Sequence, residues 1–343
     1  MIVCKFGGTS TTSLKSIQNI KALKEKNKKR QVFVFSAIGK KYQKDKKITD
    51  LLIEITQNKD IAKNKKLILN KFNKLQKDLK ININVKKLLN KYYNYFSLTK
   101  NADYLISKGE YITTLLMSKY LDIKFIPAEK IIFFQNNKKN YKKTKNKLIY
   151  YKNKYKTFAT CGFYGVDENK QIKLFSRGGS DITGAIIAKC LNANIYENWT
   201  DVYGVRQVNP KITNSKQIKK MSYADLDIMT RCDANVIHND CIEILYGEKI
   251  KLKVGNIFDI KSKKTIVVDR YKKVKFVCYK IDKDKVIIVY RDKKLNLMKN
   301  ECELSNYKEN ILKIYKKLYW KSFAHVLYLS ERFSYERKGF SSI

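Results

Sequence analysis

Two glycine pairs constrain the fold of this chain more than any other feature. Gly7-Gly8 follows the apolar segment 1–6, Gly178-Gly179 lies within the turn SRGGSD, and a segment of helical periodicity follows each pair. Because glycine has no Cβ, backbone N–H groups at such a corner can approach an anion closely, and the positive end of the next helix faces it. The order strand, glycine turn, helix predicts an α/β chain that binds ligands at the carboxyl ends of its strands.

Each corner also has a plain structural interpretation. Lys5 precedes the first pair, but the phosphate-loop pattern GxxxxGK[ST] is absent, so simple turn geometry explains this segment as well as anion binding does. In the second corner, Asp181 could cap a helix and Arg177 could form a surface ion pair. Alternatively, Arg177 could grip a carboxylate together with the N–H groups of Gly179 and Ser180, while Asp181 orients a lysine. Two such corners in one chain favour the functional interpretation.

Short apolar runs alternate with segments of helical periodicity along most of the chain. The predicted strands are 1–6, 31–36, 123–126, 131–134, 157–161 and 195–199, and the predicted helices are 12–27, one from about 49, two within 59–100, 109–121 and 182–192. A hairpin is predicted around 167–169. The low-complexity segment 136–154 is predicted to be a mobile part of the surface.

The pattern changes near Lys251. After it come β-branched runs at 265–268, 274–280 and 285–290, a helix near 306–320 and a last strand at 324–330. A chain of 343 residues is long enough for two domains. We therefore expect a main domain over 1–260 and a small α+β module over 261–343.

The charge of the chain is unusual, with 73 Lys and Arg against 31 Asp and Glu, a formal net charge of +42. Such a charge suggests nucleic acid as a partner. Only eight of the cations are Arg, however, and the Lys residues are spread over the whole length, so no localised basic face is expected. We expect no specific nucleic-acid binding, only salt-sensitive attraction to polyanions.

The seven cysteines contain no CxxC pair, which argues against a disulfide framework or a zinc site and favours a reducing compartment. No apolar run approaches 18 residues, and no leader pattern opens the chain. These features predict a cytoplasmic protein without membrane association. His238 is expected to be a packed or capping residue, so no metal site is expected there.

Seven ordered motifs together resemble one family. They are KFGGTS at 5–10, SAIGKKYQKDKKITDLL at 36–52, SKGEY at 107–111, GFYG at 162–165, FSRGGSDITGAIIA at 175–188, YENWTDVYGV at 196–205 and MSYADLDIM…ANVIH at 221–238. With these motifs, the chain resembles the aspartate kinases of the amino-acid kinase family. The resemblance covers about residues 1–260. The resemblance implies a three-layer α/β/α sandwich with a reduced ACT-like C-terminal module that serves regulation and dimerisation.

The implied reaction transfers the γ-phosphoryl group of ATP, with Mg²⁺ held mainly by the nucleotide phosphates, to the β-carboxylate of L-aspartate. This is the first step towards lysine, threonine and methionine. By resemblance, Lys5 neutralises the transferring group, the N–H groups of Gly7 and Gly8 hold its oxygens, and Asp181 orients Lys5. The implied substrate-binding residues are Ser36, Thr49, Glu110, Arg177, Gly178, Gly179 and Ser180, with Glu110 accepting the α-ammonium and Arg177 holding the α-carboxylate. Without the resemblance, Glu110 is explained as an acidic residue at the start of a helix.

The implied nucleotide positions are Lys5, Phe6, Gly7, Gly8, Thr200, Asp201, Arg206, Lys211, Asn235 and Val236. Several residues depart from the pattern of the family. Asn209 stands where many members have Asp, Asn235 where many have Lys, and Arg206 where an apolar residue is usual. Residues 261–343 have room for about one ACT-type module where members usually carry two. Two alternatives follow: a catalytically impaired relic, or a sibling kinase with another carboxylate substrate.

Overall fold

An eight-stranded mixed sheet forms the centre of the molecule. The computed structural model describes all residues except 176–177, 233, 235, 283–284, 292–297 and 320–343. The spatial order of the strands is β10 (Lys220–Ser222), β12 (Thr265–Val268), β11 (Lys251–Asn256), β9 (Ile195–Thr200), β1 (Ile2–Phe6), β2 (Arg30–Phe35), β6 (Phe158–Cys161) and β3 (Lys124–Phe125). Neighbouring strands run parallel except for the antiparallel pair β11 and β12. All residues of β1 are buried, as expected of a parallel strand covered on both faces.

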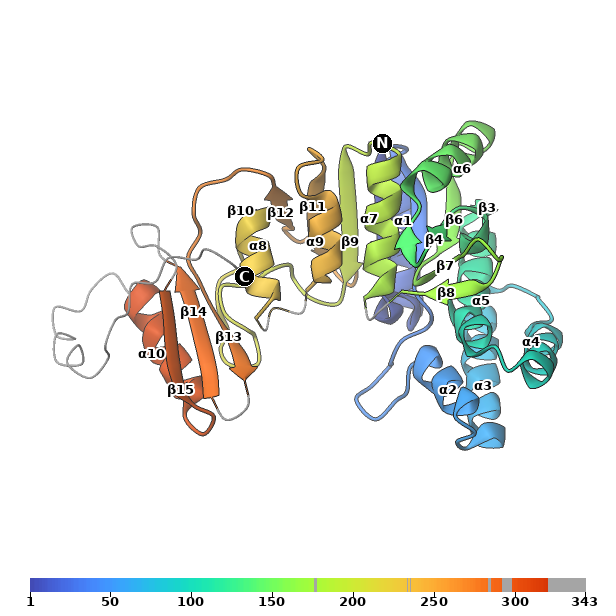
Figure 1. Ribbon diagram of the computed structural model, residues 1–343, viewed down its shortest axis with the longest axis horizontal. Coiled ribbons are helices and arrows are strands. Elements are labelled where there is room, and N and C mark those ends of the chain that lie inside the picture. The colour runs from blue at the N-terminus through green and yellow to red at the C-terminus, as the bar shows by residue number, and fades with distance from the viewer. Residues whose placement is uncertain (176–177, 233, 235, 283–284, 292–297, 320–343) are drawn as a thin grey trace.

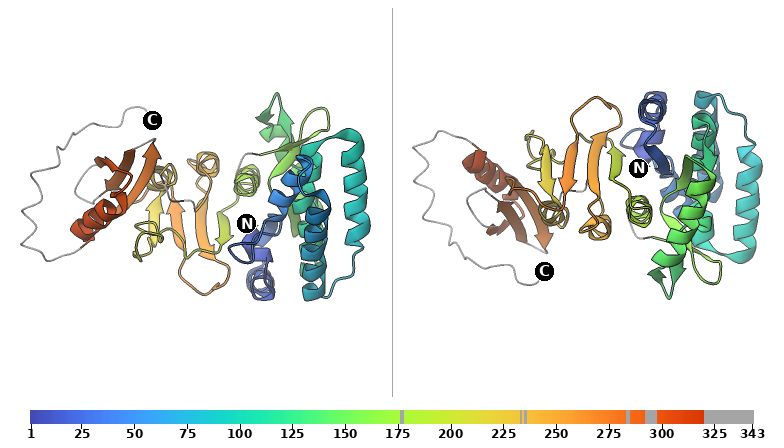
Figure 2. Two further views of the ribbon diagram at one scale, coloured as in Figure 1. Left: turned by 90° about the horizontal axis from the view of Figure 1, so that it is seen from below. Right: turned by 90° about the horizontal axis from the view of Figure 1, so that it is seen from above.

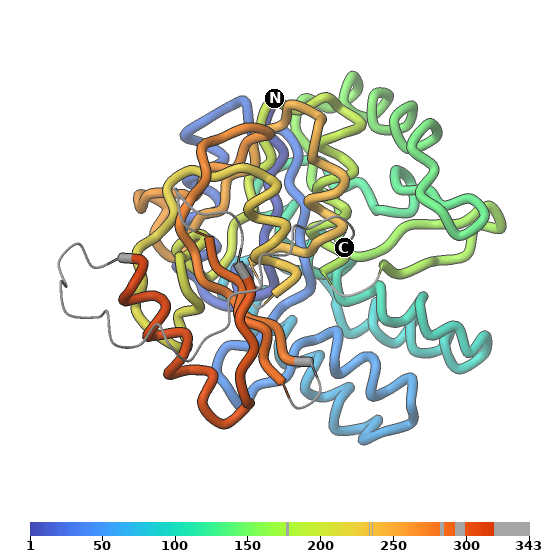
Figure 3. Tube along the Cα trace, turned by 60° about the vertical axis from the view of Figure 1, so that its left-hand side comes forward, coloured from blue at the N-terminus to red at the C-terminus, as the bar shows by residue number. Residues whose placement is uncertain are grey.

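Helices cover both faces of this sheet. One layer contains α6 (Tyr141–Lys154), α7 (Gly179–Cys190), α8 (Tyr223–Thr230) and α9 (Asn239–Leu245). The other contains α1 (Leu14–Lys26), α2 (Ile48–Thr56), α3 (Ile61–Leu79), α4 (Val85–Thr99) and α5 (Ala102–Leu121). Val3 packs in the core on the α7 side, whereas its neighbours Ile2 and Cys4 pack on the α1 side. The predicted three-layer sandwich is confirmed, and Figure 3 shows the segment of α2 to α4, in blue to teal, gathered at the lower right of the view.

Short elements complete the main part of the chain. They are the 3₁₀ helices η1 (Gly8–Thr11) and η2 (Ala128–Lys130), the pair β4 (Phe134–Gln135) and β5 (Lys138–Lys139), and the pair β7 (Tyr164–Val166) and β8 (Ile172–Leu174). The antiparallel pair of β7 and β8 is the predicted hairpin. None of the helices within the described ranges is long and apolar enough to cross a membrane.

Two predictions about helices were wrong. The segment 136–154 is an ordered helix for most of its length: the side chain of Asn140 caps α6 at Lys143 N, and Thr144 and Leu148 are buried. Thr144 and Leu148 are four residues apart and therefore lie on one face of the helix. The low-complexity composition of the segment conceals this helical spacing. The helix expected at 109–121 begins at Ala102, so Glu110 lies mid-helix and the helix dipole does not explain it.

A smaller sheet and one helix lie at one end of the molecule (Figures 1 and 2). The antiparallel strands β13 (Phe276–Asp282), β14 (Lys285–Arg291) and β15 (Met298–Glu303) precede α10 (Tyr307–Tyr319). β15 was not predicted, and the strand expected at 324–330 lies outside the described residues. The strand at 265–268 is β12 of the large sheet and not part of this module, because it pairs with β10 and β11.

The module packs against the rest of the chain on one face. Val208, in the loop after β9, is buried in the module's apolar core beside Val277 and Ile288. The Val277 N–H donates a 2.8 Å hydrogen bond to the Gln207 carbonyl. Arg291 on β14 is half-buried and forms an ion pair with the buried Asp225 at the start of α8. The loop that follows the β9 strand is therefore held by the module.

Candidate active site

Four parallel strands end at the same level of the sheet. Phe6 on β1 is in register with Phe35 on β2 and with Trp199 on β9, and Phe35 is in register with Cys161 on β6. The segments that follow these strands therefore lie along one edge. This edge brings together most of the residues that sequence analysis selected, as expected for an open α/β sheet.

Lys5 and Asp181 form the ion pair of this edge. The distance from Lys5 Nζ to Asp181 Oδ1 is 2.7 Å, and each side chain is 11% exposed. Lys5 comes from the end of β1, and Asp181 from the first turn of α7. α7 can begin there because Gly178 has a φ of +79°, and a Cβ at Gly178 would lie 2.6 Å from His238 Cβ. The pairing of Lys5 with Asp181 is the arrangement implied by the resemblance.

The first glycine turn is packed closely against the chain that follows β2. A Cβ on Gly8 would lie 2.8 Å from the Ala37 carbonyl oxygen, and the Gly39 N–H donates a 2.9 Å hydrogen bond to the Gly8 carbonyl. Only glycine fits such an approach without movement of the turn. The Gly7 N–H donates to the Trp199 carbonyl at 3.2 Å, so one of the two amides predicted to hold phosphate already has a backbone partner.

Glu110 is a buried carboxyl group on the other side of this turn. Its Oε1 accepts hydrogen bonds from Ala37 N at 3.3 Å and from Thr49 Oγ1 at 3.4 Å. Its Oε2 is buried and has no hydrogen-bond partner among the described residues. Burial raises the pKa of Glu110 to about 8, against the opposing effect of these hydrogen bonds. A buried acceptor without a partner is costly, which makes this oxygen a candidate for binding a cationic ligand.

The remaining predicted substrate residues surround the second glycine pair. Ser180 lies against Gly162, where a Cβ would come within 2.4 Å of Ser180 Oγ, and Gly179 lies against Phe163 and Phe175. The Ser36 N–H donates to the Phe6 carbonyl at 3.1 Å, which places this half-buried serine beside the end of β1. Arg177 lies outside the described residues.

The predicted nucleotide residues are only partly brought together. Thr200 follows directly on the end of β9 and donates to Asp201 Oδ1 at 3.1 Å, and Asp201 is exposed. The guanidinium of Arg206 contacts its own loop, donating to Asn214 Oδ1 at 2.8 Å and to the Ser215 carbonyl. Lys211 is exposed on the same loop.

Two other predicted nucleotide positions, Phe6 and Val236, have side chains that pack in or against the core. Phe6 is fully buried and stacks on Phe33 and Phe35, with ring centroids 6.0 Å and 5.3 Å away, so its side chain belongs to the core. Val236 is half-buried and packs on the core of the α7 layer. Asn235 lies outside the described residues.

Sequence reasoning missed three residues of this edge. Two of them, Gly39 and Gly162, stood inside the motifs listed above. Their position next to predicted strand ends was the signal that could have identified them. Asn198 is a buried amide in the middle of β9, and its Nδ2 donates to Asp181 Oδ1 at 3.2 Å. Two adjacent polar residues, Glu197 and Asn198, inside the predicted strand 195–199 were the available signal.

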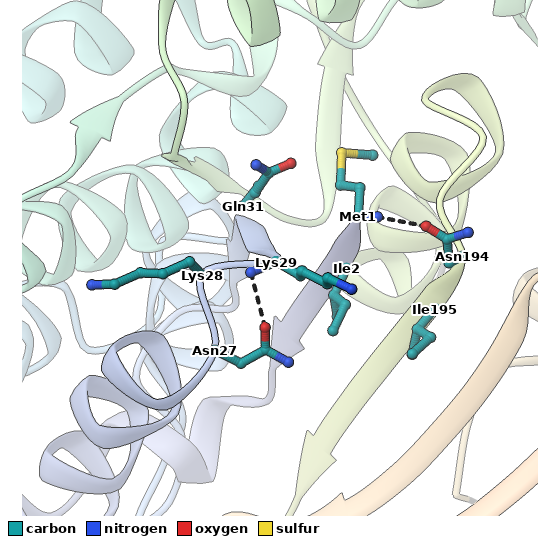
Figure 4. A pocket seen from close by; sticks show the side chains of 8 residues that line it. All are labelled: Met1, Ile2, Asn27, Lys28, Lys29, Gln31, Asn194 and Ile195. Atoms are coloured by element: carbon teal, nitrogen blue, oxygen red, sulfur yellow. Dashed lines mark hydrogen bonds between the residues drawn. The ribbon is translucent and has the colours of Figure 1, made fainter.

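Two cavities lie away from the Lys5–Asp181 pair. The larger, of about 570 Å³, opens where β1, β2 and β9 begin, and Figure 4 shows Met1, Lys29 and Asn194 among its lining residues. This is the edge of the sheet opposite to the glycine turns. The other, of about 250 Å³, lies between the η1 turn and α3. Within the described ranges no three His, Cys, Asp or Glu side chains gather to hold a metal ion.

Comparisons with known proteins agree with the motifs. The sequence model of the amino acid kinase family matches residues 1–256. Aspartokinase 3 of Bacillus subtilis is 26% identical over 296 residues, which cover 79% of this chain and 64% of that protein. A bifunctional aspartokinase/homoserine dehydrogenase of Buchnera aphidicola is 26% identical over 311 residues, covering 79% of this chain and 37% of the relative. The chain thus spans less than two thirds of the length of these two relatives.

Solved structures give the same result for the fold. The aspartate kinase of Clostridium acetobutylicum superposes with a TM-score of 0.75 at 31% identity, covering 81% of this chain and 66% of that one. E. coli aspartokinase III, in complex with aspartate and ADP, has a TM-score of 0.70 at 18% identity, covering 86% and 71%. The resemblance to aspartate kinases is confirmed by these relatives. From the match over residues 1–256 and the strand-end geometry that it contains, the chain belongs to the amino acid kinase family.

Proposed function

We propose that this protein is an aspartate kinase, which phosphorylates the β-carboxylate of L-aspartate with ATP. The observation that carries the proposal is the buried Lys5–Asp181 pair at the glycine turn, on the same strand edge as the unpartnered carboxyl oxygen of Glu110. The aspartokinases among the relatives support it. In the reaction, a β-carboxylate oxygen of aspartate attacks the γ-phosphorus, and the bond from that phosphorus to the bridging oxygen of ADP breaks. No proton is transferred.

Catalysis would consist of positioning and charge stabilisation, as is general for phosphoryl transfer. Lys5 would offset the negative charge of the transferring group, and Asp181, its ion-pair partner, would fix the direction of its side chain. The close packing of Gly8 against Gly39 would fix the position of the first glycine turn beside Lys5. Such a site needs no covalent intermediate.

Glu110 would bind the α-ammonium of aspartate. A cation at the unpartnered Oε2 would supply the missing hydrogen bond and lower the pKa of the carboxyl group, so that binding charges it. Thr49, which is hydrogen-bonded to Glu110, would contact the substrate on the same side. Arg177 would hold the α-carboxylate, as the resemblance implies.

ATP would lie along the end of β9, near Thr200 and Asp201, with Lys211 reaching its phosphates. Mg²⁺, which neutralises phosphate charge when bound, would be carried by the nucleotide. Asp201 is an exposed carboxylate that could contact the ion through water. Because Arg206 contacts Asn214 and Ser215, we propose that it orders the loop after β9 instead of contacting the adenine.

For the whole protein we propose a cytoplasmic enzyme that dimerises through the C-terminal module of β13, β14, β15 and α10. We propose that feedback control by lysine or threonine is weakened or lost in this protein. Titration of the enzyme with both amino acids tests this. A robust loss of activity at millimolar concentration would contradict it.

The test of the function is aspartate-dependent ADP release, with the acyl phosphate trapped by hydroxylamine, at about physiological salt so that the positive charge is screened. Lys5→Met should abolish hydroxamate formation. Lys189→Met is the matched control, because Lys189 forms an ion pair of the same 2.7 Å length with Glu248 at the other end of α7. Absence of hydroxamate from the folded wild-type protein, or equal activity in the two variants, would refute the proposal.

A further inference from the structure

Asn198 is a buried amide next to the Lys5–Asp181 pair. It lies on β9 in register with Lys5 on the neighbouring parallel strand β1, so both side chains project from the same face of the sheet. Its Nδ2 donates a 3.2 Å hydrogen bond to Asp181 Oδ1, the same oxygen that Lys5 Nζ contacts at 2.7 Å. The side chain of Asp181 is thus held from two adjacent strands.

The orientation of this amide follows from charge. Turned the other way, it would set its oxygen against the Asp181 carboxylate, and two acceptors would repel each other. In the observed orientation Asn198 Oδ1 is buried, and within the described ranges it has no hydrogen-bond partner. An apolar side chain would fill this position without that cost. The cost of the buried oxygen therefore indicates that the N–H group facing Asp181 is needed.

We propose that Asn198 is a positioning residue for phosphoryl transfer. Its N–H group holds Asp181 Oδ1 in place, so the carboxylate does not follow Lys5 when the ammonium moves toward the transferring phosphoryl group. A neutral donor suits this role, because a second cation would compete with Lys5 for Asp181 and a second anion would draw Lys5 away. The inference rests on the proposed function, since it assigns Asn198 a part in the same reaction.

A double-mutant cycle with Asp181 tests the proposal. Asn198→Leu should lower kcat about tenfold, the effect of losing one hydrogen bond to a charged group, and leave the KM for aspartate unchanged. In an Asp181→Asn background the same change should lower kcat less than twofold. Thr160→Val is the control, because the buried Thr160 hydroxyl also has no hydrogen-bond partner among the described residues and is not bonded to Asp181. This control should keep wild-type kcat.

A second readout separates this inference from the proposed function. The affinity for MgATP, measured by equilibrium binding without aspartate, should fall about threefold in Asn198→Leu and be unaffected by it in the Asp181→Asn background. If MgATP binding shows this dependence on Asp181 but the wild-type protein never phosphorylates aspartate, the proposed function is refuted and the positioning role is not. Equal losses in both backgrounds would overturn the positioning role. If the leucine variant does not fold, Asn198→Ala, which adds no volume, replaces it in the same cycle.

Discussion

Replacing Glu110 by glutamine should stabilise the unliganded protein at alkaline pH. Burial raises the pKa of this carboxyl group from 4.5 to about 8, while the hydrogen bonds from Ala37 and Thr49 oppose the shift. Between these two values the folded protein holds a proton that the unfolded chain has lost, so the free energy of unfolding falls as pH rises from about 4.5 to 8. At ~1.36 kcal/mol per pKa unit, a rise in pKa from 4.5 to about 8 corresponds to a loss of about 5 kcal/mol. Glutamine resembles the protonated carboxyl group and cannot ionise.

Urea unfolding of the wild type and of Glu110→Gln from pH 5 to 9 measures this effect. The stabilities should be similar near pH 5, and the variant should become progressively more stable until about pH 8. Asp45→Asn is the control: burial raises the pKa of Asp45, but hydrogen bonds led by that from Lys71 give a net lowering. Its stabilising effect is lost only as pH falls through its low folded pKa, so the deficit of this variant should stay constant from pH 5 to 9. A constant difference for Glu110→Gln as well would refute the reasoning.

The remaining predictions concern catalysis and packing. Lys5→Ala and Asp181→Ala should each lower kcat about 100-fold or more with little change in Tm, measured by the hydroxamate assay and thermal unfolding; equal losses of stability would contradict their roles. Glu110→Ala should mainly raise the KM for aspartate, by about 10- to 100-fold, since a hydrogen bond to a charged group is lost. Gly39→Ala should weaken MgATP binding, because its Cβ would lie 2.6 Å from the Gly8 carbonyl carbon; unchanged affinity by calorimetry would argue against this. Val208→Ala should lower the free energy of unfolding in urea by about 1–2 kcal/mol and raise the KM for ATP, since Val208 packs the loop after β9 against the module. An unaltered KM would show that Val208 affects stability and not nucleotide binding.

Sequence reasoning succeeded where the information is local. The apolar runs of β1 and β2, the glycine corners and the hairpin of β7 and β8 depend on a few consecutive residues, and all were predicted close to their observed positions. It failed where packing decides. The α6 helix was hidden by Lys- and Asn-rich composition, and its order comes from the burial of Thr144 and Leu148 against other elements.

By itself, the sequence determined the α/β order and the residue types at the strand ends, because turn geometry, strand burial and helix starts follow from neighbouring side chains. Only the tertiary structure decided which distant residues meet. Strand register sets Asn198 beside Lys5, and the packing of α5 under the turn after β2 buries Glu110 and so raises its pKa. The same applies to β12, which joins the large sheet because its partners, β10 and β11, are supplied by other parts of the chain. Register and desolvation are properties of the assembled sheet, and no single segment encodes them.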